Sequence, residues 1–137
     1  MRYVVIDTSV AFKLLLAYGE AGIDEAWALM RQHRARELLL VSPEVGFIEM
    51  ANVLRYIGVD AASADGLLED YERLGIEPAR QSAARVRLAC ACAFEHGISL
   101  YDAMFLALAQ ELDCELVTAD RRAFGRIPTD VARVRLI

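Results

Sequence analysis

Four carboxylates stand in local sequence that a hydrophobic core alone would not select: Asp7, Glu49, Asp102 and Asp120. Asp7 and Asp120 each end an apolar run, Glu49 interrupts an apolar stretch, and Asp102 stands near the start of a strongly apolar segment. Burial of an unpaired carboxylate is costly, and four of them in one place would repel one another without a cation between them. The sequence therefore predicts a divalent metal site, and oxygen-only ligands favour Mg²⁺ or Mn²⁺ over zinc or copper.

Each carboxylate also has a purely structural interpretation. Asp7 could cap the helix that follows the first strand, and Asp102 lies three residues after a serine, which is the spacing of a capping box. Asp120 could cap the turn that follows it. Glu49 is the hardest to explain in this way, and an ion pair with Arg55 or another arginine is the best structural alternative. Taken one at a time, both interpretations stay open.

The elements that must position these residues follow an α/β pattern, because short apolar runs alternate with amphipathic stretches. Ser42 and Pro43 form a favourable helix start, with serine as the N-cap and proline at the first helical position. We expect strands at residues 3–6, 38–41, 75–78, 115–118 and 131–136, the last at a sheet edge. We expect helices at residues 9–17, 22–35, 43–57, 60–74, 79–95 and 99–112.

This order of elements brings the acids together. Asp7 and Asp120 would lie at the carboxyl ends of two parallel strands, which is the edge where open α/β sheets bind their ligands. Asp102 would lie in the first turn of the helix before the second of these strands. Hydroxyls expected near the same edge are those of Thr8, Ser9 and Thr118.

Length and composition indicate one globular domain over residues 1–137, with 56% apolar and 26% charged residues. No apolar run approaches the ~18–20 residues that span a membrane, and the first residues do not read as a signal peptide. We therefore expect a cytoplasmic protein with no membrane partner. The net charge of −5 argues against a simple electrostatic nucleic-acid binder. Cys90, Cys92 and Cys114 lack zinc-site spacing and are interpreted as reduced, mostly buried side chains.

Other chemistries of acidic α/β proteins lack support. A phosphoaspartate receiver or a dehalogenase-type phosphatase needs a lysine near the end of a late strand, but Lys13, the only lysine, belongs to the first expected helix. The chain also has no glycine-rich phosphate loop and no Gly-x-Ser-x-Gly elbow. Nucleophilic and ATP-dependent catalysis are therefore not expected.

Four segments have a recognisable type and order: residues 4–10 (VVIDTSV), Ser42-Pro43 with residues 49–54 (EMANVL), residues 99–109 (SLYDAMFLALA), and residues 118–120 (TAD) with Phe124. Together they resemble the PIN-domain family and, within it, the VapC-type toxins of toxin–antitoxin pairs. The third segment is the most specific. The resemblance covers almost the whole chain.

The resemblance implies a three-layer fold with a small central parallel sheet flanked by helices. It also implies a metal-dependent endoribonuclease that hydrolyses RNA phosphodiesters with Mg²⁺ or Mn²⁺. The residues that it carries over as metal ligands and catalytic groups are Asp7, Glu49, Asp102 and Asp120. The supporting polar residues that it suggests are Ser9, Asn52 and Thr118. One or two metal ions are both compatible with this set.

Arginine side chains are the candidates for binding RNA phosphates, because guanidinium pairs with phosphate bidentately. Residues 79–137 carry eight basic and seven acidic residues, whereas residues 1–78 carry seven and thirteen, so the excess negative charge lies in the first part. The positions selected are Arg85, Arg121 and Arg122. Two rival interpretations remain: a catalytically silent PIN-fold regulatory module, and a DNA-directed nuclease with the same metal site.

The toxin resemblance also implies a cognate antitoxin and a homodimer. Apolar side chains are frequent in the first two expected helices. Some must fill the core, and the remainder could form a groove for an antitoxin helix. These side chains are Phe12, Leu15, Leu16, Trp27 and Met30.

Overall fold

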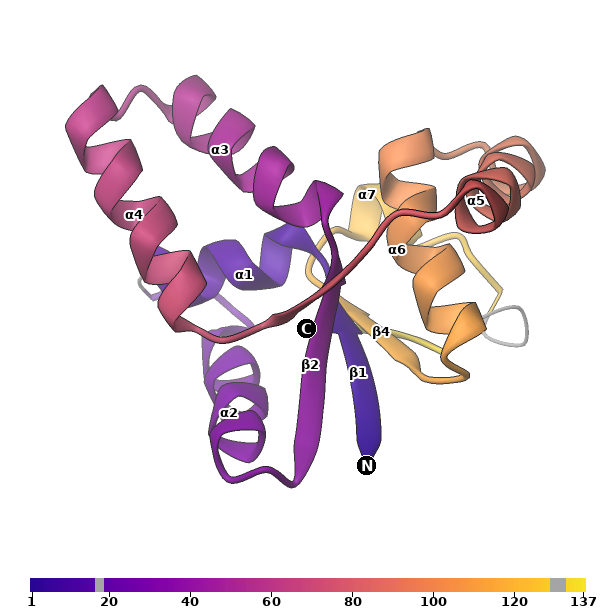
Figure 1. Ribbon diagram of the computed structural model, residues 1–137, viewed down its shortest axis with the longest axis horizontal. Coiled ribbons are helices and arrows are strands. Elements are labelled where there is room, and N and C mark those ends of the chain that lie inside the picture. The colour runs from indigo at the N-terminus through magenta and orange to yellow at the C-terminus, as the bar shows by residue number, and fades with distance from the viewer. Residues whose placement is uncertain (17–18, 129–132) are drawn as a thin grey trace.

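The computed structural model describes residues 1–16, 19–128 and 133–137. The described residues form a five-stranded, all-parallel sheet in the order β3-β2-β1-β4-β5 (Figure 1). The strands are β1 (Arg2–Ile6), β2 (Leu38–Pro43), β3 (Glu77–Ala79), β4 (Glu115–Thr118) and β5 (Val134–Leu136). The helices are α1 (Thr8–Leu15), α2 (Ile23–Arg34), α3 (Val45–Ile57), α4 (Ala61–Arg73), α5 (Ala83–His96), α6 (Leu100–Glu111) and α7 (Arg121–Phe124). The expected α/β architecture with a helix-flanked parallel sheet is confirmed.

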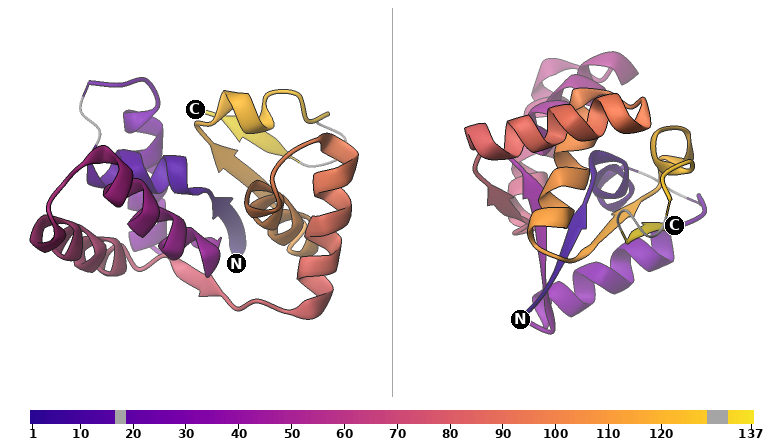
Figure 2. Two further views of the ribbon diagram at one scale, coloured as in Figure 1. Left: turned by 90° about the horizontal axis from the view of Figure 1, so that it is seen from above. Right: turned by 90° about the vertical axis from the view of Figure 1, so that its right-hand side faces the viewer.

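The sheet is buried on both faces, which explains why its central strands are continuously apolar. Successive residues of a strand point to opposite faces. Accordingly, Val4 and Ile6 pack with α1, α2, α3 and α4, whereas Val5 packs with α5 and α6. Figures 1 and 2 show these two groups of helices on the two sides of the sheet. No helix in the described part of the chain is long and apolar enough to cross a bilayer.

The predicted start of the third helix was wrong. Ser42 and Pro43 end β2, where they pair with Pro78 and Ala79 of β3, and α3 begins only at Val45. The local preference of a serine–proline pair for a helix start is worth about 1 kcal/mol. Here the extension of the sheet outweighs it, and the side chain of Ser42 is buried.

The predicted start of the fifth helix was wrong for the same reason. Ala79 belongs to β3, and α5 begins at Ala83, where the Ser82 hydroxyl accepts a hydrogen bond from the Arg85 N–H at 3.1 Å. The other four expected helices correspond to α1, α2, α4 and α6 and have bounds within two residues of those observed. Residue 17, the expected end of the first, lies outside the described residues, and the short helix α7 was not predicted. The last expected strand is found at Val134–Leu136, and its first two expected positions, 131 and 132, lie outside the described residues.

Candidate active site

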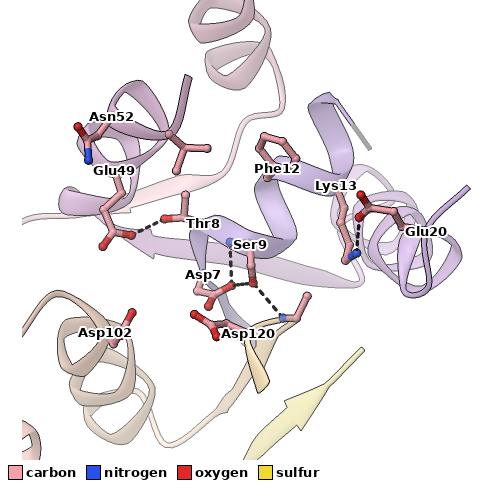
Figure 3. A pocket seen from close by; sticks show the side chains of 12 residues that line it. Asp7, Thr8, Ser9, Phe12, Lys13, Glu20, Glu49, Asn52, Asp102 and Asp120 are labelled. Atoms are coloured by element: carbon pink, nitrogen blue, oxygen red, sulfur yellow. Dashed lines mark hydrogen bonds and ion pairs between the residues drawn. The ribbon is translucent and has the colours of Figure 1, made fainter. Parts of the chain in front are cut away.

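A pocket of about 510 Å³ opens at the carboxyl ends of β1 and β4 (Figure 3). All four predicted carboxylates line it, and each comes from a different part of the fold. Asp7 follows β1, Glu49 projects from α3, Asp102 lies in the first turn of α6, and Asp120 lies between β4 and α7. The convergence that the sequence suggested is therefore present at the sheet edge where it was expected.

Asp7 is the most buried of the four, with 5% of its surface exposed. Its Oδ1 accepts hydrogen bonds from the Ser9 N–H at 3.1 Å and from the Ser9 hydroxyl at 2.5 Å. Its Oδ2 accepts a hydrogen bond from the Thr118 hydroxyl at 2.6 Å. Both oxygens thus have hydroxyl donors, and the carboxylate also caps α1, as its structural interpretation required.

The two hydroxyls beside Asp7 are oriented by backbone groups that follow β4. The Ala119 N–H donates to Ser9 Oγ at 2.9 Å, and the Asp120 N–H donates to Thr118 Oγ1 at 3.0 Å. Each hydroxyl oxygen already accepts a backbone hydrogen, so its own hydrogen is directed to Asp7. Ser9 and Thr118, predicted as supporting polar residues, therefore join the ends of β1 and β4 and fix the rotamer of Asp7.

Glu49 is held by Thr8, whose hydroxyl was expected near the sheet edge but was not predicted to contact Glu49. The Thr8 hydroxyl donates to Glu49 Oε2 at 2.6 Å, although 41 positions separate the two residues (Figure 3). Within the described residues Glu49 makes no ion pair, so the proposed pairing with Arg55 was wrong. Asn52, one turn further along α3, also lines the pocket. A mid-helix acid without a cationic partner is a group that a metal ion could satisfy.

Asp102 and Asp120 lie at helix starts. The Ser99 hydroxyl accepts the Asp102 N–H at 3.1 Å at the start of α6, and Asp120 Oδ1 accepts the Ala123 N–H at 3.0 Å at the start of α7. Asp120 therefore caps α7 as predicted, whereas at the start of α6 the cap is the Ser99 hydroxyl. Capping at these helix starts does not exclude a role for Asp102 and Asp120 in the pocket, because both side chains also line it.

Burial in this pocket changes the acidity of Asp7. Loss of solvent raises the pKa of Asp7 from 3.8 to about 6. The hydrogen bonds from Ser9, Thr118 and the Val10 N–H oppose this rise, and the charge of Asp120 reinforces it. Asp7 is therefore a carboxyl group that ionises only near neutral pH when no cation is bound.

Two further acids of the pocket shift in the same direction. Burial raises the pKa of Glu49, which the Thr8 hydrogen bond partly offsets and the three other carboxylates reinforce. Burial also raises the pKa of Asp102, with a further contribution from Asp120. The four groups thus repel one another through the pocket and favour a cation there.

The donor chemistry of the pocket fits Mg²⁺ or Mn²⁺, because four carboxylates provide hard oxygen ligands. Across residues 1–16, 19–128 and 133–137, no three acidic, histidine or cysteine side chains are packed closely enough to form a ready-made ligand cluster. The four carboxylates therefore line one pocket but are spaced apart, as expected for groups of like charge. Asp7 is buried, Glu49 and Asp102 are half-buried, and the pKa of each is raised. None of them forms an ion pair among the described residues, so a bound cation would stabilise their ionised forms.

The three arginines predicted to bind substrate lie outside the described lining of the pocket. Arg121 and Arg122 are exposed at the start of α7, directly after Asp120. Arg85 forms an ion pair with Glu111, with Nε–Oε2 at 2.6 Å, and donates to the carbonyl oxygen of Arg80. Its part in phosphate binding stays a prediction, as does that of Arg121 and Arg122.

Sequence reasoning did not assign five of the lining residues to the site: Phe12, Lys13, Glu20, Val53 and Ala119. Lys13 was noted only as the single lysine of the chain. A usable signal existed, because Ser9 and Lys13 are four residues apart and so share one face of α1. Glu20 lies outside a regular element, so no local pattern could have placed it.

Comparisons with known proteins agree with this fold. The family model described as "PIN domain" matches residues 4–129. A search of curated proteins found no match. Among solved structures, VapBC2 from Rickettsia felis, bound to a DNA fragment from its promoter, is 14% identical with a TM-score of 0.74, and the alignment covers 98% of each chain.

Two other solved structures are similar over nearly their whole length. A toxin–antitoxin complex from Klebsiella pneumoniae is 19% identical, with a TM-score of 0.69 and coverage of 96% of this chain and 95% of that one. FitAcB from Neisseria gonorrhoeae is also 19% identical, with a TM-score of 0.61 and coverage of 98% and 96%. At these identities the likeness establishes the shared fold.

Proposed function

Because the chain belongs to the PIN domain family, we propose that it is a metal-dependent endoribonuclease and the toxin of a toxin–antitoxin pair. The observation that carries the proposal is the pocket lined by four carboxylates from four parts of the fold. The raised pKa values of Asp7, Glu49 and Asp102 suit a bound cation rather than a purely structural role.

Asp7, Glu49, Asp102 and Asp120 would hold the metal. Bound Mg²⁺ or Mn²⁺ would lower the pKa of a coordinated water and stabilise the charge that develops on the phosphate. Asp7 must be ionised for this role, and a pKa of about 6 leaves it mostly ionised at pH 7 and above. The described pocket lining contains no histidine that could serve as a general base.

The hydroxyl network supports the reaction by fixing the acids in place. Ser9 and Thr118 hold Asp7 in one rotamer, and Thr8 holds Glu49. Side chains held by such bonds lose no conformational freedom when the substrate binds, which favours catalysis. Ser9, Thr8 and Thr118 are therefore proposed as positioning residues, and Asn52 as a further polar group at the rim.

RNA is proposed as the substrate because the chain resembles VapC-type toxins, and single-stranded RNA can bend into a recessed pocket more readily than a duplex. The test is cleavage of matched single-stranded RNA and DNA oligonucleotides with Mg²⁺, with Mn²⁺ or with a chelator. We expect metal-dependent cleavage of RNA, and a loss of at least about 100-fold in Asp7→Asn. Asp65→Asn, an exposed change on α4, is the matched control.

Two outcomes would count against this proposal. Equal cleavage of RNA and DNA would refute the substrate class but leave the metal site intact. Cleavage by Asp7→Asn at the wild-type rate would refute the site itself. Loss of activity in both Asp7→Asn and Asp65→Asn would indicate that general instability, rather than the site, had been measured.

An antitoxin partner and a homodimer are proposed on the likeness to toxin–antitoxin complexes. The early helices leave little apolar surface for a groove, because Met30 is fully buried and Trp27 packs against the core. More apolar area is exposed on α3, where Ile48 and Tyr56 are 67% and 82% exposed, and on α5, where Phe94 is 87% exposed. A monomer in solution that binds no neighbouring gene product would refute both proposals.

A further inference from the structure

Lys13 is the only lysine of the chain, and its side chain lies in the wall of the carboxylate pocket with 10% of its surface exposed. Among the pocket-lining residues of the described chain it is the one cation, beside five carboxylates. A buried ammonium group requires an anionic partner. That partner is Glu20, with Lys13 Nζ and Glu20 Oε2 3.0 Å apart.

The two members of this ion pair differ in exposure. The Glu20 side chain is 54% exposed and precedes α2, whereas the lysine is fixed within α1. Another anion could therefore take the place of Glu20 from the solvent side while Lys13 stays where it is. Such an exchange would never leave the buried ammonium unpaired, so it avoids the main cost of breaking a buried ion pair.

Figure 3 shows where the ion pair lies in the pocket. Lys13 and Glu20 lie at one end, Glu49 and Asp102 lie at the other, and Asp7 and Asp120 lie between them (Figure 3). The one cation of the described lining, with its partner Glu20, therefore lies at the end of the pocket away from Glu49 and Asp102. A strand that placed one phosphate at the acids would extend its neighbouring nucleotide along this wall.

We propose that Lys13 binds a phosphate of the substrate strand next to the one that is cleaved, and that Glu20 occupies the lysine until this phosphate displaces it. The inference rests on the proposed nuclease function and names a substrate-binding residue within it. An ammonium group suits the task because its three N–H groups can donate to phosphate oxygens from several directions. The exposed arginines then serve more distant parts of the strand.

The alternative is that the pair only braces the segment before α2. The two explanations predict opposite effects of Glu20→Gln. If Glu20 competes with phosphate, its neutralisation frees Lys13 and strengthens RNA binding. If the pair is a brace, Glu20→Gln and Lys13→Met both loosen the same contact and change RNA binding in the same direction.

The experiment measures binding of a fluorescent single-stranded RNA by anisotropy in the Asp7→Asn background, so that binding is separated from cleavage. We expect Lys13→Met to weaken binding about tenfold. We also expect it to reduce the slope of log affinity against log salt by roughly 0.7, the value for one phosphate contact on a single strand. Glu20→Gln should tighten binding about threefold, and Lys13→Arg should retain the contact.

Matched controls remove the same charges elsewhere. Arg31→Met acts on the exposed side of α2, and Glu37→Gln acts at the opposite end of β2. Both should leave RNA affinity within about twofold of the parent. Unchanged affinity in Lys13→Met, or weaker binding in Glu20→Gln, would overturn the inference. Failure of the nuclease proposal is seen separately, as absence of RNA cleavage by the wild-type protein.

Discussion

Replacing Asp7 with asparagine should make the metal-free protein more stable at neutral and alkaline pH. Asparagine has nearly the shape of aspartate, and Thr118 can adapt because its oxygen can accept a hydrogen from the new amide. Ser9 can still donate to the remaining carbonyl oxygen. The substitution thus keeps the packing and removes a charge that is buried with 5% exposure beside other carboxylates.

The magnitude follows from the change in pKa. Burial raises the pKa of Asp7 from 3.8 to about 6, so the folded state binds a proton that the unfolded chain has already lost. Stability therefore falls as pH rises through this window and stays low above it. The penalty is about half a kcal/mol at pH 4 and about 3 kcal/mol at pH 8. Asparagine does not titrate, so Asp7→Asn escapes this penalty.

Thermal unfolding in a chelator at several pH values measures the effect. At pH 8, Asp7→Asn should melt roughly 10 °C above wild type, and the difference should shrink to a degree or two at pH 4. Asp65→Asn, which removes an exposed charge, should show no such pH dependence. Saturating Mn²⁺ should then stabilise wild type by about 3 kcal/mol at 100 times its Kd and leave Asp7→Asn unchanged.

The reasoning fails if metal-free Asp7→Asn is no more stable than wild type at pH 8. That result would mean that the hydrogen bonds to Asp7 stabilise its ionised form by at least as much as burial destabilises it. A stability gain that was equal at pH 4 and pH 8 would also refute it, because the gain would not arise from titration. Stabilisation of Asp7→Asn by Mn²⁺ as strong as that of wild type would remove Asp7 from the metal site.

Three further substitutions test the positioning of the site and the packing of helices α3 and α4. Thr8→Val removes the donor to Glu49, so the pKa of Glu49 should rise further and RNA cleavage should fall about tenfold, most strongly at low pH. Gly46→Ala would place a methyl group 2.5 Å from the Ser42 hydroxyl oxygen and should lower the free energy of unfolding by about 1–3 kcal/mol in a denaturant titration. Gly66→Ala, on α4, meets only open space and should raise the free energy of unfolding by about 0.5–1 kcal/mol. Unchanged RNA cleavage in Thr8→Val would contradict the positioning role of Thr8. Equal changes in stability from the two alanine substitutions would contradict the packing argument.

Local sequence patterns predicted most of the elements and all four carboxylates. Apolar runs mark the strands because a parallel sheet is buried on both faces, and Glu115–Thr118 was placed at its observed bounds. The acids were found because a carboxylate inside or at the end of an apolar run contradicts the local pattern. Their approach to one edge followed from the rule that parallel strands end together.

The errors lay where a distant partner competed with a local preference. Ser42 and Pro43 favour a helix start by themselves, but β3 offers them strand partners more than 30 residues away. The same competition moved the start of α5. The local sequence contains no information on such strand pairing, because the free energy gained from pairing depends on a distant segment of the chain.

The contacts that complete the pocket were likewise decided only by the tertiary structure. Thr8 meets Glu49 across 41 positions, and Thr118 meets Asp7 across 111. The sequence by itself determined which residues could carry the chemistry, because side-chain type and burial pattern are local properties. Their hydrogen-bond partners, and the direction in which Lys13 points, depend on how α1, α3 and β4 pack, since a contact between distant positions exists only once the chain has folded.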